Sequence, residues 1–103
     1  MGRLVRVAMV SELPPGTGRQ VQADGQPVAV FNVGGTVHAI AGACSHRGGP
    51  LGEGALEGSV VTCPWHGARF EVTTGAVLSP PAPRSMATYR VIVEDDAIMV
   101  DLP

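Results

Sequence analysis

The sequence contains no lysine, and its seven basic residues are arginines that do not cluster anywhere along the chain. With nine acidic residues, the formal net charge at pH 7 is −2. Proteins that bind nucleic acids or anionic membranes concentrate positive charge on one surface. The charge balance therefore argues against both kinds of partner.

Long apolar segments are also missing. No run approaches the roughly 20 apolar residues of a membrane-spanning helix, so we expect no association with a membrane. The first ten residues carry Arg3 and Arg6 but lack the apolar core of a secretory signal. We therefore expect a cytoplasmic protein. Thiols stay reduced in that compartment, so the two cysteines, which are flanked by histidines, are expected to be ligands and not a disulfide.

Aromatic residues are few, with one Trp, one Tyr and two Phe, whereas glycine (14) and proline (9) are frequent. Short runs rich in Val, Ile and Ala lie between these turn residues, and none shows a helical period over three turns. The pattern predicts an all-β protein, a small antiparallel β-sandwich or barrel, as a single domain over residues 1–103. Strands are expected at residues 4–9, 19–23, 28–32, 36–40, 60–62, 69–72, 88–93 and 97–100.

Turn residues connect these strands. The pair Asp24-Gly25 predicts a tight hairpin turn, so residues 19–40 are expected to form a three-stranded meander. Residues 88–100 are expected to form a closing hairpin, and residues 56–59 to form a turn.

Both cysteines and two of the three histidines fall in two short segments. The first reads Cys-Ser-His at residues 44–46, and the second reads Cys-Pro-Trp-His at residues 63–66. Each supplies one thiolate and one imidazole, which are ligands of zinc and of iron–sulfur clusters. A zinc ion needs all four groups to converge on one point and is usually held by cysteine pairs, so this order is unusual for zinc. A zinc-stabilised binding module and ordinary buried cysteines are the alternatives.

These segments and their neighbours resemble the ligand loops of the Rieske [2Fe–2S] family, in which two cysteines hold one iron and two histidines hold the other. The resemblance runs from about Thr36 to the C-terminus, and the proline-rich residues 79–83 resemble the loop that covers the cluster in that family. It implies one [2Fe–2S] cluster in a cluster-binding subdomain formed by two loops, within about residues 41–83. The cofactor-binding and metal-binding residues it implies are Cys44, His46, Cys63 and His66.

Two positions beside the second loop bear on the reduction potential. Respiratory members of the family carry a serine and a tyrosine that donate hydrogen bonds to the sulfurs, at the positions of Ala68 and Phe70 here. They also brace the two loops with an additional disulfide, for which this chain has no cysteines. Because such hydrogen bonds raise the potential, we expect a value at the low end of the family range, around −150 mV.

A low potential is similar to that of the soluble Rieske-type ferredoxins of aromatic-ring dioxygenase systems. This resemblance implies a monomeric one-electron carrier, not an enzyme, that passes electrons from a flavin-dependent reductase to a terminal oxygenase. A non-haem iron oxygenase site needs two histidines and a carboxylate, whereas only His38 is left over, and we expect it to be structural or exposed. The alternative function is that of a small Rieske-like subunit of a larger reductase such as nitrite reductase.

Electron transfer requires close approach, so the ligand histidines are expected at an exposed tip. Trp65, between two ligands, is expected to be partly exposed beside the cluster. The apolar residues around the tip are expected to form a small, transient docking patch. These residues are Gly49, Pro50, Leu51, Trp65, Pro80 and Pro81.

Overall fold

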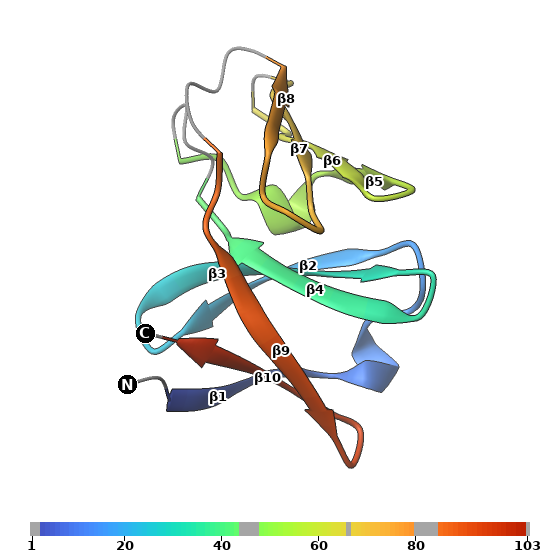
Figure 1. The fold of residues 1–103 in the computed structure, drawn as a ribbon, viewed down its shortest axis with the longest axis vertical. Helices are drawn as coiled ribbons and strands as arrows, with labels where there is room; N and C mark the ends of the chain where they lie inside the picture. The colour runs from blue at the N-terminus through green and yellow to red at the C-terminus, as the bar shows by residue number, and fades with distance from the viewer. Residues whose placement is uncertain (1–2, 44–47, 66, 80–84, 103) are drawn as a thin grey trace.

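The computed structural model of the chain describes residues 3–43, 48–65, 67–79 and 85–102. Two antiparallel sheets account for nearly all regular structure in these ranges, as the composition predicts (Figure 1). No helix in these ranges is long and apolar enough to cross a membrane.

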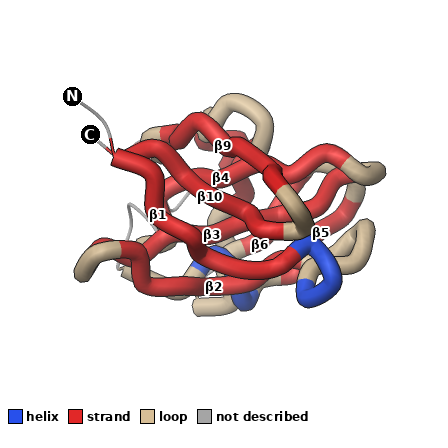
Figure 2. Tube along the Cα trace, turned by 90° about the horizontal axis from the view of Figure 1, so that it is seen from below, coloured by secondary structure: helices blue, strands red, loops and turns tan. Residues whose placement is uncertain are grey.

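The larger sheet has six strands and forms the lower part of the molecule in Figure 1. Its two edge strands lie in contact, so the sheet curls into a nearly closed barrel (Figure 2). In spatial order its strands are β1 (Arg3–Met9), β10 (Ala97–Leu102), β9 (Thr88–Glu94), β4 (Thr36–Ala41), β3 (Gln26–Val33) and β2 (Gly18–Ala23).

The smaller sheet has four short strands and lies above the barrel in Figure 1. Two short 3-10 helices complete the described elements: η1 follows β1, and η2 precedes the small sheet. The bounds are β5 (Ala55–Glu57), β6 (Val60–Thr62), β7 (Arg69–Glu71), β8 (Val77–Ser79), η1 (Val10–Glu12) and η2 (Leu51–Glu53).

Every predicted strand is present, and the predicted meander and closing hairpin are confirmed. All three hairpin turns of the barrel place two consecutive residues at positive φ: Asp24 (55°) and Gly25 (82°), Gly34 (59°) and Gly35 (99°), and Asp95 (50°) and Asp96 (70°). Positive φ at both central positions is the geometry of a type I′ turn, whose twist matches that of the flanking strands.

Strands β5 and β8 were not predicted. The predicted turn over residues 56–59 is wrong in its first half, because residues 55–57 form β5 and pair with β6. Both strands have three residues and lie at the two edges of the small sheet. Their pairing is imposed by the inner strands β6 and β7, so no run of β-forming residues marks them in the sequence.

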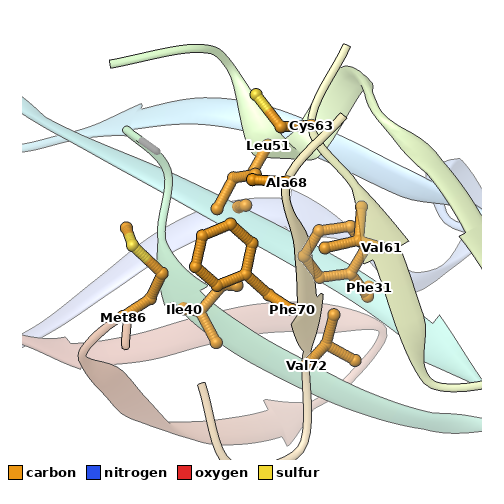
Figure 3. Close-up of a cluster of buried hydrophobic side chains, with 10 residues drawn as sticks. Phe31, Ile40, Leu51, Val61, Cys63, Ala68, Phe70, Val72 and Met86 are labelled. Atoms are coloured by element: carbon orange, nitrogen blue, oxygen red, sulfur yellow. The ribbon is translucent and has the colours of Figure 1, made fainter. Parts of the chain in front are cut away.

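Strand β3 is buried on both faces and separates two apolar cores. Val28 and Val30 face the barrel core, while Ala29 and Phe31 face the second core, at the junction with the small sheet. Alternate residues of a strand point to opposite faces, so this one strand contributes side chains to both cores. The junction core consists of Ala29, Phe31, Ile40, Leu51, Val61, Cys63, Ala68, Phe70, Val72 and Met86 (Figure 3).

We predict that Phe31→Ala destabilises the protein by about 3–5 kcal/mol. Phe31 is fully buried in the junction core, and its removal leaves a cavity between the two sheets. The apparent midpoint of thermal unfolding, followed by circular dichroism at a fixed heating rate, should fall by roughly 10 °C or more.

Leu4→Ala is the matched control, because Leu4 is half-exposed on the edge strand β1. Surface changes of this kind are usually within about 0.5 kcal/mol of neutral. Equal midpoints for the two variants would contradict the role assigned to the junction core.

Candidate metal centre

Of the four predicted ligands, only Cys63 lies within the described residues. Cys44, His46 and His66 lie outside them, so the complete ligand set stays a prediction. For the same reason, the described part of the chain brings together no group of three or more metal-binding side chains. The geometry of the site is therefore built from Cys63 and from the chain segments that flank the other three residues.

The second ligand loop joins β6 to β7 and is closed tightly at its base. Thr62 pairs with Arg69 as the last rung of the hairpin. Beyond this rung, the Cys63 amide donates to the Ala68 carbonyl oxygen at 2.7 Å, and the Gly67 amide donates to the Cys63 carbonyl oxygen at 3.1 Å. Cys63 is thus fixed at the point where the strand ends.

The first ligand loop follows β4 and is also closed at its base. Ala43 and Pro50 form an antiparallel bridge, and the Leu51 amide donates to the Gly42 carbonyl oxygen at 3.0 Å. The chain therefore leaves β4 and returns beside the same strand end.

The two loops touch each other at Gly49 and Cys63. A Cβ placed on Gly49 would lie 2.7 Å from the Cys63 sulfur and 3.2 Å from the Trp65 ring. Real side chains do not approach so closely, so only glycine allows this contact. The backbone of one loop therefore lies directly against the thiol of the other.

Cys63 lies at one end of the junction core and is only 3% exposed. In Figure 3 its sulfur points away from Phe70 and Ile40, beyond Leu51 and Ala68. A thiol that is shielded by apolar side chains on one side and by glycine backbone on the other suits a sulfur ligand of an iron–sulfur cluster, whose potential depends on such shielding. The described part of the site, around Cys63, thus fits the predicted group.

The predicted docking patch needs correction. Leu51 is fully buried, because η2 turns its side chain into the junction core, and Gly49 is also buried. Neither contributes to an exposed patch. Trp65 is 56% exposed, which confirms the predicted partial exposure of that residue, whereas Pro80 and Pro81 lie outside the described residues.

The chain that returns from the proline-rich segment is held against the small sheet. The Met86 amide donates to the Gly75 carbonyl oxygen at 2.7 Å, and the Val77 amide donates to the Ser85 hydroxyl at 3.0 Å. Gly75 has a φ of 78°, and a Cβ there would collide with the Met86 carbonyl. The chain that follows the proline-rich segment is thereby fixed next to β8, as a third segment besides the two ligand loops.

Glu71, a residue that the sequence did not single out, joins the two outer turns of the small sheet. Its carboxylate accepts hydrogen bonds from the Thr73 hydroxyl at 2.6 Å and from the Ser59 hydroxyl at 2.9 Å. These two bonds, with a smaller contribution from the charge of His38, hold the pKa of Glu71 below its ordinary value. His38 itself is half-buried on β4, consistent with a structural role.

The comparisons with known proteins agree with this geometry. Residues 3–90 match the family model described as Rieske [2Fe-2S] domain, and the chain belongs to this family. It is 40% identical over 97 residues to the biphenyl dioxygenase ferredoxin subunit of Pseudomonas sp. (strain KKS102), covering 93% of this chain and 89% of the relative. The cofactor of the chain is accordingly a Rieske-type [2Fe–2S] cluster.

Two solved structures bear on the choice between carrier and subunit. The first is described as the complex of reduced oxygenase and oxidized ferredoxin in carbazole 1,9a-dioxygenase (36% identity, TM-score 0.87, 94% of this chain and 91% of that chain). The second is a putative NADH-dependent nitrite reductase small subunit from Mycobacterium tuberculosis (25% identity, TM-score 0.86, 100% of this chain and 97% of that chain). The backbone fold is common to both classes, whereas the sequence is closer to the dioxygenase ferredoxins.

We predict that Gly49→Ala impairs the site. The new methyl group would press on the Cys63 sulfur, and relief of such overpacking costs about 1–3 kcal/mol. The purified variant should contain less iron per chain than the wild type, and its reduced form should give shifted EPR g-values.

Gly34→Ala is the control for Gly49→Ala. Alanine at Gly34 is the harsher change for the backbone, because φ there is 59° whereas Gly49 has no positive φ, but a Cβ on Gly34 meets no atom within 4 Å. Wild-type iron content in Gly49→Ala, or an equal loss in Gly34→Ala, would contradict the close contact at Cys63.

We predict a pH-dependent effect of Glu71→Gln. Because the folded-state pKa of Glu71 is lowered, the ionised carboxylate stabilises the fold above the pKa of the unfolded chain, and this contribution is lost as the pH falls through the folded value. The wild type should therefore melt at a higher temperature than the variant near pH 6, and the gap should close progressively below about pH 5.

Glu57→Gln, on the exposed strand β5, makes the same change of charge in the same sheet. The difference in melting temperature between this variant and the wild type should not change over the same pH range. A Glu71→Gln gap that stays constant from pH 6 to pH 3.5 would refute the assignment, because the stabilisation would then not depend on ionisation of Glu71.

Proposed function

We propose that the chain is the one-electron carrier of a multicomponent aromatic-ring dioxygenase system, taking electrons from a flavin-dependent reductase and delivering them to a terminal oxygenase. The observation that carries this assignment is the position of Cys63. Its thiol is buried at the end of the junction core, yet it lies beside Trp65, which is largely exposed. The site is therefore shielded from water but close to the protein surface.

Similarity to the biphenyl dioxygenase ferredoxin subunit supports this role. The solved complex of an oxygenase with its ferredoxin supports the terminal oxygenase as electron acceptor. Composition supports a carrier without catalysis. A non-haem iron site needs two histidines and one carboxylate, whereas the chain has three histidines and two of them are proposed as cluster ligands. A cytoplasmic monomer that binds its partners transiently is the form we propose.

The proposed ligands divide between the two loops. We assign Cys44 and Cys63 to one iron and His46 and His66 to the other. The assignment is based on the order in which these residues occur in the family pattern. When bound, the cluster takes up one electron and gives it back. The protein contributes two loops closed at their bases, a dry apolar surface on the side of Leu51, and a glycine that brings backbone against the thiolate.

Ala68 and Phe70 support a low reduction potential. Both are fully buried in the junction core, and Ala68 lies between Cys63 and Phe70 in Figure 3. Neither side chain has a hydroxyl that could donate to a sulfur. Fewer donors leave the reduced, more negative cluster less stabilised, so the potential is low.

We predict that Ala68→Ser raises the midpoint potential above that of the wild type, which we expect at around −150 mV. The serine hydroxyl would stand next to Cys63 and could donate to its sulfur. Redox titration monitored by EPR measures the shift, and Ala23→Ser, equally buried but in the barrel core, is the control. An unchanged potential in Ala68→Ser would contradict the proposed position of the cluster.

The proposed function is tested by the visible and EPR spectra of the purified protein before and after reduction with dithionite. A red-brown protein that takes up one electron and gives a signal of average g about 1.9 is expected. Addition of the reductase and terminal oxygenase of a biphenyl dioxygenase system should then give product only when this chain is present.

Two outcomes would overturn the assignment. A colourless protein with one bound zinc would indicate a binding module, which metal removal would unfold. Stable copurification with a large reductase, through an extensive apolar interface, would indicate a subunit of the nitrite reductase type.

A further inference from the structure

One side chain of the barrel reaches both ends of the first ligand loop. Gln20 lies on β2, 24 positions before Cys44 and outside the part of the sequence that resembles the ligand loops. Its amide nitrogen donates to the Gly42 carbonyl oxygen at 3.1 Å, and its amide oxygen accepts from the Gly52 amide at 2.8 Å. Gly42 precedes the loop and Gly52 follows it.

The two partners fix the orientation of the amide, since a carbonyl oxygen can only accept and a backbone N–H can only donate. Glutamine carries a donor and an acceptor at one end of a flexible stem, so it can satisfy both groups at once. A glutamate carboxylate has only acceptors when ionised and would face the Gly42 carbonyl without a hydrogen. The contact therefore depends on an amide at position 20.

Close packing around Gln20 shows that the contact is built into the fold. A Cβ on Gly42 would lie 2.6 Å from the Gln20 amide nitrogen, and a Cβ on Gly52 would collide with the backbone of β2 at Gln20. Glycine at both positions lets the loop ends lie directly on the strand. Gly42 is held further by its own amide, which donates to the Pro27 carbonyl oxygen at 2.9 Å.

The fixed ends transmit this restraint to the site. Pro50 and Ala43 are bridged just inside the clamped glycines, and Gly49, the next residue, touches the Cys63 sulfur. A change in the loop base at Gly52 therefore moves backbone that contacts the described thiol.

We propose that Gln20 is a positioning residue for the cluster: its amide clamps both ends of the loop that carries Cys44 and His46, and so sets how that loop meets Cys63. The role rests on the proposed ligand set. It gives this chain, which has no cysteines to spare for a disulfide between its loops, a polar cross-link from the barrel instead.

The test compares purified holoprotein carrying Gln20→Met or Gln20→Glu with the wild type. Gln20→Met removes both hydrogen bonds at similar volume, and Gln20→Glu keeps the acceptor for Gly52 but loses the donor to Gly42. Gln22→Met is the matched control, because Gln22 is exposed on the same strand.

Three readouts are needed: the rate of bleaching by a ferrous chelator under reducing conditions, the EPR spectrum of the reduced protein, and the thermal midpoint of each oxidised holoprotein. Gln20→Met should bleach about tenfold faster or more, as loss of two hydrogen bonds implies, with broadened or shifted g-values. Gln20→Glu should fall between it and the wild type, and Gln22→Met should match the wild type in all three readouts.

Wild-type bleaching and EPR spectra in both Gln20 variants would overturn the role. So would faster bleaching with an unchanged EPR spectrum and a lowered thermal midpoint of the holoprotein, or variants that do not fold, since Gln20 would then act on the stability of the fold alone. A colourless wild type would overturn the proposed function itself, and this is seen before any variant is compared.

Discussion

Burial of apolar side chains between the two sheets is the constraint on which the site depends. Phe31 from the barrel and Phe70 from the small sheet are both fully buried in one core, and Cys63 closes that core at the end where the ligand loops meet. Three-residue strands are too short to be stable alone. The small sheet is therefore held by its contact with the barrel, and the position of the thiol follows from that packing.

Hydrogen bonds fix the geometry of the segments that this apolar packing brings together. Gln20 ties the base of the first ligand loop to β2, and Glu71 ties the two outer turns of the small sheet to each other. Hydrogen bonds of this kind contribute modestly to net stability, but they fix geometry, because an unmade bond in a partly buried site is costly. A redox site needs fixed geometry, since small displacements of ligands and donors change its potential.

Most of the fold could be predicted because its strands carry local signals. Long strands such as β3 and β9 are rich in β-branched residues, and the Asp24-Gly25 turn shows in the sequence. Edge strands β5 and β8 carry no such signal, since their pairing comes from neighbours. Leu51 is expected from the sequence among the apolar residues of the docking patch, whereas η2 directs it into the junction core.

The sequence by itself determined the chemistry: two cysteines and two histidines in an order that few sites other than a Rieske cluster use, with His38 as the one histidine besides. The tertiary structure alone decided what surrounds that chemistry. The contact of Gly49 with Cys63, the clamp by Gln20 and the burial of Leu51 join residues far apart in the chain. Ligand identity is a property of residue type and local order, whereas shielding and restraint arise only when distant segments are packed together.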